Sequence, residues 1–317
     1  MKRILAGSVA LMLIAAVASY GRVPRGSGAL HSNRLRIDNL TRDFYHYVPS
    51  NLEGSPKLIF VLHGSGMMAK GMQMLSGHEF DRMADKYRDM IIVYPQGYGR
   101  YWNDCRKGGT FDAKKLKVDD VAFFLAMIKY YRDKFGINDS AVFAAGYSNG
   151  AQMCFKLAKE CPELFKGIAA VSANLPAEGN DDCTESGKPV SILVMNGTSD
   201  PVNPYNGGLV KAGDGKQRGE VISTSRSMQY WLTLDKGDTT SVTEYPYPDV
   251  DQRDKSTAIK YSYRCAQTGK TVVLVKVING GHIFMNDGFR YWPRVLGNVN
   301  KDISAPRVIM DFFRSLN

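Results

Sequence analysis

The sequence predicts an α/β fold in which a mostly parallel β-sheet carries helices on both faces. Apolar runs of strand length, such as residues 58–62 and 90–94, alternate along the chain with segments whose apolar side chains recur at helical spacing. Unbroken apolar runs are typical of strands buried on both faces, and strands that alternate with helices form parallel sheets. No change in composition marks a second domain, so we expect one domain over residues 35–317.

The composition is that of a globular protein. Of the 317 residues, 44% are hydrophobic, which excludes intrinsic disorder, and no fixed repeat or heptad array is present. The 41 Lys and Arg residues outnumber the 31 Asp and Glu residues, but they are scattered along the chain. Nucleic-acid-binding proteins more often show a basic stripe with interleaved aromatic residues, so we expect no nucleic-acid partner.

Residues 1–18 predict a signal peptide for export. Lys2 and Arg3 give the positive start, residues 4–18 are almost all apolar, and Ala16-Val17-Ala18 is a small-x-small cleavage pattern. The apolar run is shorter than the ~20 residues of a membrane-spanning helix, and no cysteine follows it for lipid attachment. We therefore expect a secreted protein, extracellular or periplasmic, with no stable membrane anchor after signal cleavage. Residues 19–34 predict a flexible spacer.

The predicted elements follow in chain order. Residues 35–37 and 44–48, around the turn-prone Asp38-Asn39, predict a short antiparallel hairpin. The clearest helix begins near Asp119 or Asp120 and is closed by Gly136. The expected strands are residues 58–62, 90–94, 141–146, 168–172, 192–196 and 272–278. The other expected helices are residues 80–87, one through Met153 and Leu157, one around residues 228–234, and a last one opened by Ser304 and Pro306.

The segment Gly146-Tyr147-Ser148-Asn149-Gly150 matches the GxSxG pattern. Alone the pattern is weak, and a surface Ser-Gly turn is the structural alternative. Here it lies between an apolar strand and an amphipathic helix, which is the arrangement of a nucleophile elbow. Glycines on both sides remove Cβ atoms that would clash in so tight a turn. Ser148 is therefore the predicted nucleophile.

His282 is the predicted base for this serine. It follows the strand at residues 272–278 and the flexible Asn279-Gly280-Gly281, where this type of fold delivers a base. A capping or surface histidine is the structural alternative. The remaining histidines have other expected places. His31 lies in the spacer, His46 in the hairpin, His63 in a backbone turn and His78 at a helix start.

Asp200 is the acid expected to orient His282. It comes shortly after the strand at residues 192–196, and its carboxylate would accept a hydrogen bond from the imidazole and fix its tautomer. An Asx-type turn before Pro201 is the structural alternative. The chain order Ser, Asp, His is the one expected of α/β-hydrolases.

Two backbone N–H groups are expected to form an oxyanion hole. One belongs to Asn149, directly after the nucleophile, and the other to Ser65, in the loop after the strand at residues 58–62.

The five cysteines all follow the leader, where export permits disulfides, but an odd number leaves at least one unpaired and spacing does not fix the pairing. Since no CxxC pair or Cys/His cluster with zinc spacing occurs, we expect no cysteine-based metal site.

With these residues identified, the chain resembles the secreted esterase family that contains feruloyl esterases and polyhydroxybutyrate depolymerase-like enzymes, within the α/β-hydrolase superfamily. The resemblance covers about residues 35–317. The matching stretches run in family order: Val61-Leu62-His63-Gly64-Ser65-Gly66, Tyr94-Pro95-Gln96-Gly97, Trp102-Asn103-Asp104, Val118-Asp119-Asp120-Val121, residues 146–150, Met195-Asn196-Gly197-Thr198-Ser199-Asp200-Pro201, Asn203-Pro204-Tyr205 and Gly280-Gly281-His282.

The resemblance implies an α/β-hydrolase fold and a catalytic triad of Ser148, Asp200 and His282. It also implies that Trp102 and Asn103 shape the acyl pocket and that Tyr205 lines its rim, although Trp102 could equally be a packing aromatic under a loop. Asp119 and Asp120 match the family too, but we expect helix caps there.

A disulfide between Cys161 and Cys183 is a further implication, because such enzymes often bridge these two places. Two departures from the family pattern lie near His282. Asn279 stands where the family has a third glycine, and residues 283–286 replace its usual Trp-Pro-Gly.

The sequence thus predicts an exported serine carboxylesterase that works through an acyl-enzyme and needs no cofactor. The expected substrate is a feruloyl or related hydroxycinnamoyl ester on plant cell-wall polysaccharide. Depolymerisation of a polyhydroxyalkanoate is the main alternative. A serine peptidase and a non-catalytic binding module are less favoured, since no cap or propeller domain is visible and all three triad positions are filled.

Overall fold

The structure is a computed structural model, and it describes residues 26–237, 241–286 and 293–316. The predicted signal peptide and the first part of the predicted spacer lie outside these residues. The strands of the main sheet are β1 (Ala29–Ile37), β2 (Leu40–Val48), β3 (Lys57–Leu62), β4 (Met90–Pro95), β5 (Val142–Tyr147), β6 (Gly167–Val171), β7 (Ser191–Gly197), β10 (Val242–Pro246), β11 (Thr257–Cys265) and β12 (Lys270–Ile278). A second, small sheet consists of β8 (Gly208–Leu209) and β9 (Glu220–Val221).

α-Helices connect most of the inner strands. The α-helices are α2 (Ala69–Leu75), α3 (Glu79–Tyr87), α4 (Asp112–Lys115), α5 (Asp120–Phe135), α6 (Asn149–Glu160), α7 (Thr224–Leu234), α8 (Pro293–Leu296) and α9 (Ala305–Ser315). Short 3₁₀ turns are η2 (Tyr98–Arg100), η3 (Pro162–Leu164), η4 (Glu178–Asn180) and η5 (Gln252–Asp254). In the part of the chain that the structure describes, no helix combines the length and the hydropathy needed to cross a bilayer.

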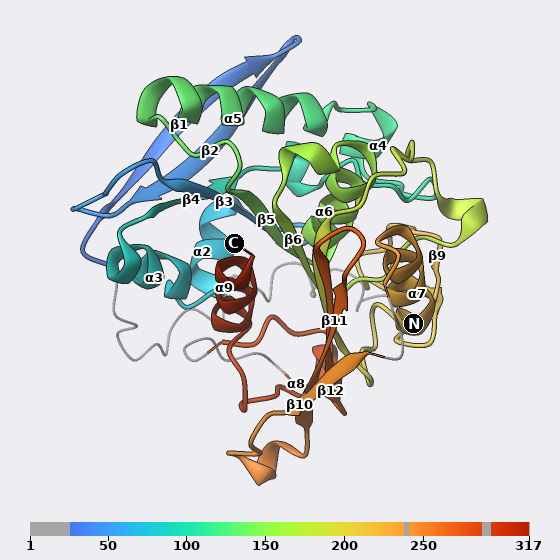
Figure 1. Cartoon of the computed structure of the whole chain (residues 1–317). Coiled ribbons are helices and arrows are strands. Elements are labelled where there is room, and N and C mark those ends of the chain that lie inside the picture. Colours follow the sequence, from blue (N-terminus) through green and yellow to red (C-terminus); the bar gives the residue numbers. More distant parts are fainter. Residues whose placement is uncertain (1–25, 238–240, 287–292, 317) are drawn as a thin grey trace, which may run out of the picture.

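The main sheet has the order β1-β2-β4-β3-β5-β6-β7-β12-β11-β10, and it runs through the centre of the molecule in Figure 1. The six inner strands, from β4 to β12, pair in parallel, and antiparallel hairpins extend the sheet at both edges. Helices α5, α6 and α7 share one apolar core with one face, while α2, α3 and α9 share a second core with the other. The predicted parallel sheet with two helical layers is confirmed.

Helix α5 shows how the sequence sets an element's ends. The Asp119 carboxylate accepts the N–H of Ala122 at 2.8 Å, and Gly136 ends the helix with φ 58°. Asp120 plays a different part from the predicted cap. Its buried carboxylate pairs with Arg42 on β2 at 2.6 Å and accepts the backbone N–H of Asn103 at 2.7 Å. This ion pair ties the hairpin to the helix.

The predicted spacer extends too far into the domain. Strand β1 begins at Ala29 and pairs with β2 along its whole length, so residues 29–34 belong to the sheet. Most of its side chains are exposed, so the strand has no apolar pattern to reveal it, and backbone pairing alone defines it.

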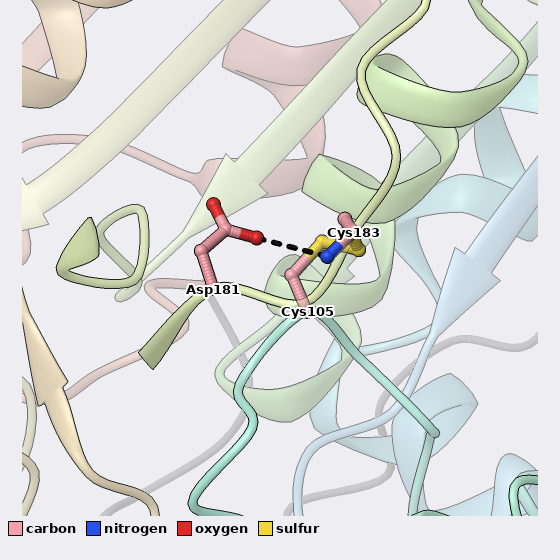
Figure 2. Close-up of side chains that lie close together, drawn as sticks. All are labelled: Cys105, Asp181 and Cys183. Carbon is pink, nitrogen blue, oxygen red and sulfur yellow. Dashed lines mark hydrogen bonds between the residues drawn. A yellow bond between two sulfur atoms is a disulfide. The ribbon is translucent and has the colours of Figure 1, made fainter. Parts of the chain in front are cut away.

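The predicted disulfide between Cys161 and Cys183 is wrong, because Cys183 is bonded to Cys105 (Figure 2). The loops that carry these two cysteines run side by side, and the N–H of Asp182 donates to the carbonyl of Cys105 at 3.0 Å. Cys161 instead ends α6 with its thiol in the apolar core, 6% exposed. The carboxylate of Asp181 lies beside the bridge and accepts the N–H of Cys183, but sulfurs bonded to each other do not make a metal site.

Candidate active site

Ser148 stands in a sharp turn between β5 and α6. Its backbone has φ 54° and ψ −114°, a strained conformation for a residue with a side chain. The flanking glycines make the turn possible, as predicted. A Cβ on Gly146 would lie 2.2 Å from the carbonyl oxygen of Gly150, and one on Gly150 would lie 2.5 Å from that of Leu62. The serine is thereby held at the carboxyl end of β5 and at the first turn of a helix.

His282 meets Ser148 from the loop after β12. Its Nε2 lies 2.9 Å from Ser148 Oγ. Its main chain is fixed on both sides, because its N–H donates to the carbonyl of Leu296 at 2.6 Å and its carbonyl accepts the Tyr147 hydroxyl at 2.8 Å. Asn279, in place of the expected glycine, has φ 56°, which asparagine tolerates.

Asp200 holds the other side of the imidazole. Its Oδ2 lies 2.7 Å from Nδ1 of His282, while its Oδ1 accepts the backbone N–H groups of Val202 and Asn203, both at 2.8 Å. The carboxylate therefore forms the Asx turn and also meets the histidine, so the two interpretations of this residue are compatible. With Nδ1–H donating to Asp200, Nε2 is left as the acceptor that faces the serine hydroxyl.

Asp200 and His282 are largely shielded from water, whereas Ser148 is half-buried. The side chain of Asp200 is 1% exposed and that of His282 is 6% exposed. Hydrogen bonds to a charged group are stronger in such a low-dielectric setting than in water. The arrangement can take a proton from Ser148 and hold the resulting imidazolium beside a carboxylate.

His63 has the structural role that the sequence predicted. Its ring is fully buried, its Nδ1 lies 2.8 Å from the carbonyl of Gly64, and its Nε2 accepts the N–H of Gly97 at 3.0 Å. Burial lowers the pKa of this imidazole to about 4, so it stays neutral at physiological pH. The ring therefore fixes the loop that leads to Ser65.

The side chain of Asn149, next to the nucleophile, is fixed by a buried network. Its Oδ1 accepts the backbone N–H of Trp102 at 2.8 Å, and its Nδ2 donates to the Asp104 carboxylate at 2.6 Å. Asp104 is itself paired with Arg106, at 2.5 Å. In the sequence, Asp104 stands out only as part of a matching stretch, because nothing in the pattern indicates that this acid is buried beside the nucleophile turn.

Trp102 and Asn103, predicted for the acyl pocket, are both buried. Trp102 is fully buried, packs beside His63 and Phe124, and donates its indole N–H to the His63 carbonyl at 2.9 Å. These contacts fit the alternative in which Trp102 is a packing aromatic, because its side chain has no exposed surface left to contact an ester. The Asn103 amide donates to the carbonyl of Val118, and the residue lines a cavity of about 390 Å³ between α5 and α6.

Ser65 and Tyr205 remain predictions. Ser65 follows β3 as expected, and its Oγ lies 3.5 Å from Nη2 of Arg218. Arg218 is itself buried and paired with Asp214 at 2.7 Å, a feature that no sequence pattern indicated. Tyr205 lies five residues after Asp200, and burial raises the pKa of its phenol.

Comparison with known proteins agrees with this geometry. Residues 118–212 match a family model described as phospholipase/carboxylesterase, a stretch that includes Ser148 and Asp200. The solved structure of an acetyl xylan esterase from Aspergillus awamori matches the fold with a TM-score of 0.57, over 92% of this chain and all of that one, at 15% identity. The chain has the α/β-hydrolase fold.

In sequence, the chain is similar to esterases. It is 27% identical over 271 residues to NocK of Nocardia uniformis subsp. tsuyamanensis, which is named as an esterase; the match covers 83% of this chain and 75% of that protein. It is 31% identical over 134 residues to feruloyl esterase B of Talaromyces stipitatus, which covers 40% of this chain but only 35% of that protein. The comparisons place the chain among carboxylic ester hydrolases.

Proposed function

We propose that this α/β-hydrolase is a serine carboxylesterase whose nucleophile is Ser148. The observation that carries the proposal is the unbroken hydrogen-bond chain from Asp200 through His282 to Ser148, at 2.7 and 2.9 Å. Nucleophile, base and orienting acid at these separations are the arrangement that activates a serine hydroxyl.

In the proposed reaction, Ser148 Oγ bonds to the ester carbonyl carbon while its proton passes to His282 Nε2. The carbonyl oxygen becomes an oxyanion, for which the backbone N–H groups of Asn149 and Ser65 are the proposed donors, each worth about 2.7–4 kcal/mol in enzymes of this kind. Collapse of the intermediate breaks the ester C–O bond, and the leaving alcohol takes the proton from His282. Water then attacks the acyl-enzyme with the same base and frees the serine.

We propose a feruloyl or related hydroxycinnamoyl ester of plant polysaccharide as the substrate. Several relatives are named as feruloyl esterases, and a solved structure with the same fold is an acetyl xylan esterase. The resemblance of the motifs to feruloyl esterases supports the same class. The proposed mechanism uses no cofactor.

We also propose that the protein is exported and acts outside the cytoplasm. The apolar N-terminal segment with its cleavage pattern supports export, and so does the disulfide between Cys105 and Cys183, since such bonds persist mainly in oxidising compartments. N-terminal sequencing of protein recovered from an expressing host tests this, with Ser19 expected as the first residue. An uncleaved N-terminus would contradict it.

The activity is tested with wild type, Ser148→Ala and a matched control, Ser140→Ala. Ser140 is exposed, and its hydroxyl donates to Oδ1 of Asn138 at 2.7 Å, so removing this hydroxyl leaves the proposed triad untouched. The substrates are p-nitrophenyl acetate, methyl ferulate, acetylated xylan and a polyhydroxybutyrate suspension.

We expect turnover of methyl ferulate by wild type and Ser140→Ala, and a fall of at least about 10³-fold in Ser148→Ala. Clearing of the polyester without ferulate release would favour the depolymerase alternative. Equal behaviour of all three proteins on every ester would overturn the proposal.

A further inference from the structure

A polar groove lies away from the triad, between the outer strands of the sheet and α9. It encloses about 610 Å³, and eight of its fifteen lining residues carry a hydroxyl group. In Figure 1, β10 lies at the bottom of the view below β11, and residues of α9 line the groove together with both strands. This β10–β11 groove is lined mainly by polar side chains, unlike the apolar core beside it.

The strand register explains the floor of the groove. Thr243 on β10 lies opposite Ser262 on β11, which lies opposite Val273 on β12. One step along, Tyr245 lies opposite Lys260. Residues directly opposite each other in an antiparallel pair share a face of the sheet, so hydroxyls and a tyrosine ring form one continuous surface.

Two tyrosines form the outer part of this surface. The rings of Tyr245 and Tyr247 meet edge to face, with centroids 5.2 Å apart, and Lys260 Nζ lies 5.4 Å from the centroid of Tyr245. Tyr245 is 48% exposed although it is a large aromatic residue. A tyrosine held in this way offers an apolar ring and a polar hydroxyl to a ligand at low entropic cost.

The charges of the groove are unbalanced. Lys260 and Arg264 contribute two cations, and Asp311 on α9 contributes one carboxylate. Among the residues that the structure describes, neither cation forms a salt bridge. A ligand that fits this surface would therefore carry many hydroxyls, flat C–H faces for the rings and a negative charge.

The end of the groove at Thr271 and Val273 is remote from the nucleophile. The tyrosine end lies closer to it, because the N–H of Tyr247 donates to the carbonyl of Ala258, which pairs with Val277. The β12 residues of the groove, Thr271 and Val273, begin the strand, whereas His282 follows the strand's end at Ile278. Five residues separate Val273 from Ile278, which corresponds to about 17 Å at about 3.3 Å per residue. A molecule at that end of the groove would not occupy the ester site, although a polymer could span both.

We propose that the β10–β11 groove binds a uronate-bearing oligosaccharide segment of the polysaccharide whose ester reaches Ser148. The sugar rings would pack on Tyr245, their hydroxyls would bond to the Ser and Thr side chains of the floor, and the carboxylate would pair with Arg264 or Lys260. The choice of polysaccharide rests on the proposed function, while the position and the charge preference rest on the groove.

Calorimetric titration of the full chain carrying Ser148→Ala tests the proposal, because it measures binding without hydrolysis. The probes are a xylotetraose that carries one 4-O-methylglucuronate and plain xylotetraose. We expect the acidic probe to bind at least tenfold more tightly than the neutral one. Adding Tyr245→Ala or Arg264→Gln should weaken its binding at least fivefold, whereas Tyr245→Phe and the remote Lys129→Gln should change it less than twofold.

Three results would overturn the proposal: no binding of the acidic probe, equal affinity for both probes, or binding that neither groove variant weakens. The tested groove residues are on the surface, so thermal unfolding of each variant should match that of the parent. Failure of the proposed function is separate. It would appear as absent ester hydrolysis by Ser148-containing protein, whatever the titrations show.

Discussion

Asp200 does two things with its two carboxylate oxygens, and this division can be tested at the level of one atom. We expect Asp200→Asn to keep the fold, because the amide oxygen can still accept the N–H groups of Val202 and Asn203. The amide nitrogen would replace Oδ2 beside His282 and donate to Nδ1. The imidazole would then adopt the tautomer that turns an N–H toward the serine.

The expected result is a fall in kcat of about 10³–10⁴-fold with a thermal unfolding temperature within about 1 °C of wild type. Steady-state kinetics on p-nitrophenyl acetate and a thermal scan measure the two quantities. A fall of less than tenfold in kcat would show that His282 does not depend on Asp200 for its tautomer.

Asn149 offers a second test at the residue scale, because its side chain and its backbone have separate tasks. Asn149→Ala keeps the N–H proposed for the oxyanion hole but removes the bonds to Trp102 and Asp104. The buried Asp104 carboxylate would lose one partner, at a cost of about 1–3 kcal/mol in unfolding free energy. We expect kcat to fall about tenfold with KM nearly unchanged, measured beside urea unfolding. An unchanged kcat would show that the network serves stability alone.

Single residues differ in how far sequence could predict them. Ser148 and His282 were predictable because each follows a strand in a short glycine-containing loop, so local chain direction fixes where the side chain goes. The orientation of the Trp102 ring was not predictable, because a motif shared with a family does not say which way an aromatic ring turns. Its ring fills the space beside His63 and Phe124.

At the scale of elements, the buried inner strands were predictable and the outer hairpin was not. The apolar runs that became β3, β4 and β5 are buried at almost every position. Strand β10 is exposed throughout, and β11 is only partly buried, so neither has an apolar run. Backbone pairing of β11 to β12 and of β10 to β11 holds them, and pairing leaves little trace in the residue types.

The end of α7 carries a carboxyl group that should make stability depend on pH. Asp235 is fully buried at the helix C-terminus, and burial raises its pKa to about 7, against the opposing charge of Lys270. The folded state therefore keeps its proton at pH values where the unfolded chain, with a pKa of about 3.9, has lost it. The unfolding free energy should fall as pH rises from about 4 to about 7, by up to about 4 kcal/mol.

Asp235→Asn should remove this fall, because an amide does not ionise. Urea unfolding at pH 5 and pH 8 measures the effect, and the variant should gain stability over wild type only at the higher pH. Asp133→Asn, on an exposed face of α5, is the matched control. Removing this exposed carboxylate should change the unfolding free energy by less than about 0.5 kcal/mol at either pH. Parallel wild-type and Asp235→Asn profiles would contradict the prediction.

At the scale of the whole molecule, the disulfide links loops at the edge of the sheet where the nucleophile turn lies. Cys105 follows β4 and Cys183 precedes β7, with a sequence separation of 78 residues. The segment between them contains α5, β5, the Ser148 turn and α6. Sequence spacing could not give this pairing, because two loops come together only through the path of all the elements between them. Cys161 looked suitable by position, but its helix points the thiol into the core.

Counting free thiols in denaturant distinguishes the two pairings without any measurement of activity. Of the five cysteines, Cys154, Cys161 and Cys265 are free, so unfolded wild type should react with three equivalents of a thiol reagent. Cys161→Ser should then react with two, because it removes a free thiol, whereas Cys183→Ser should react with four, because it releases Cys105. If Cys161 were bridged to Cys183, Cys161→Ser would instead expose four thiols, since its partner would be freed.

Loss of the bridge should also lower the unfolding free energy by about 2–4 kcal/mol, because the unfolded chain regains the freedom of a long closed loop.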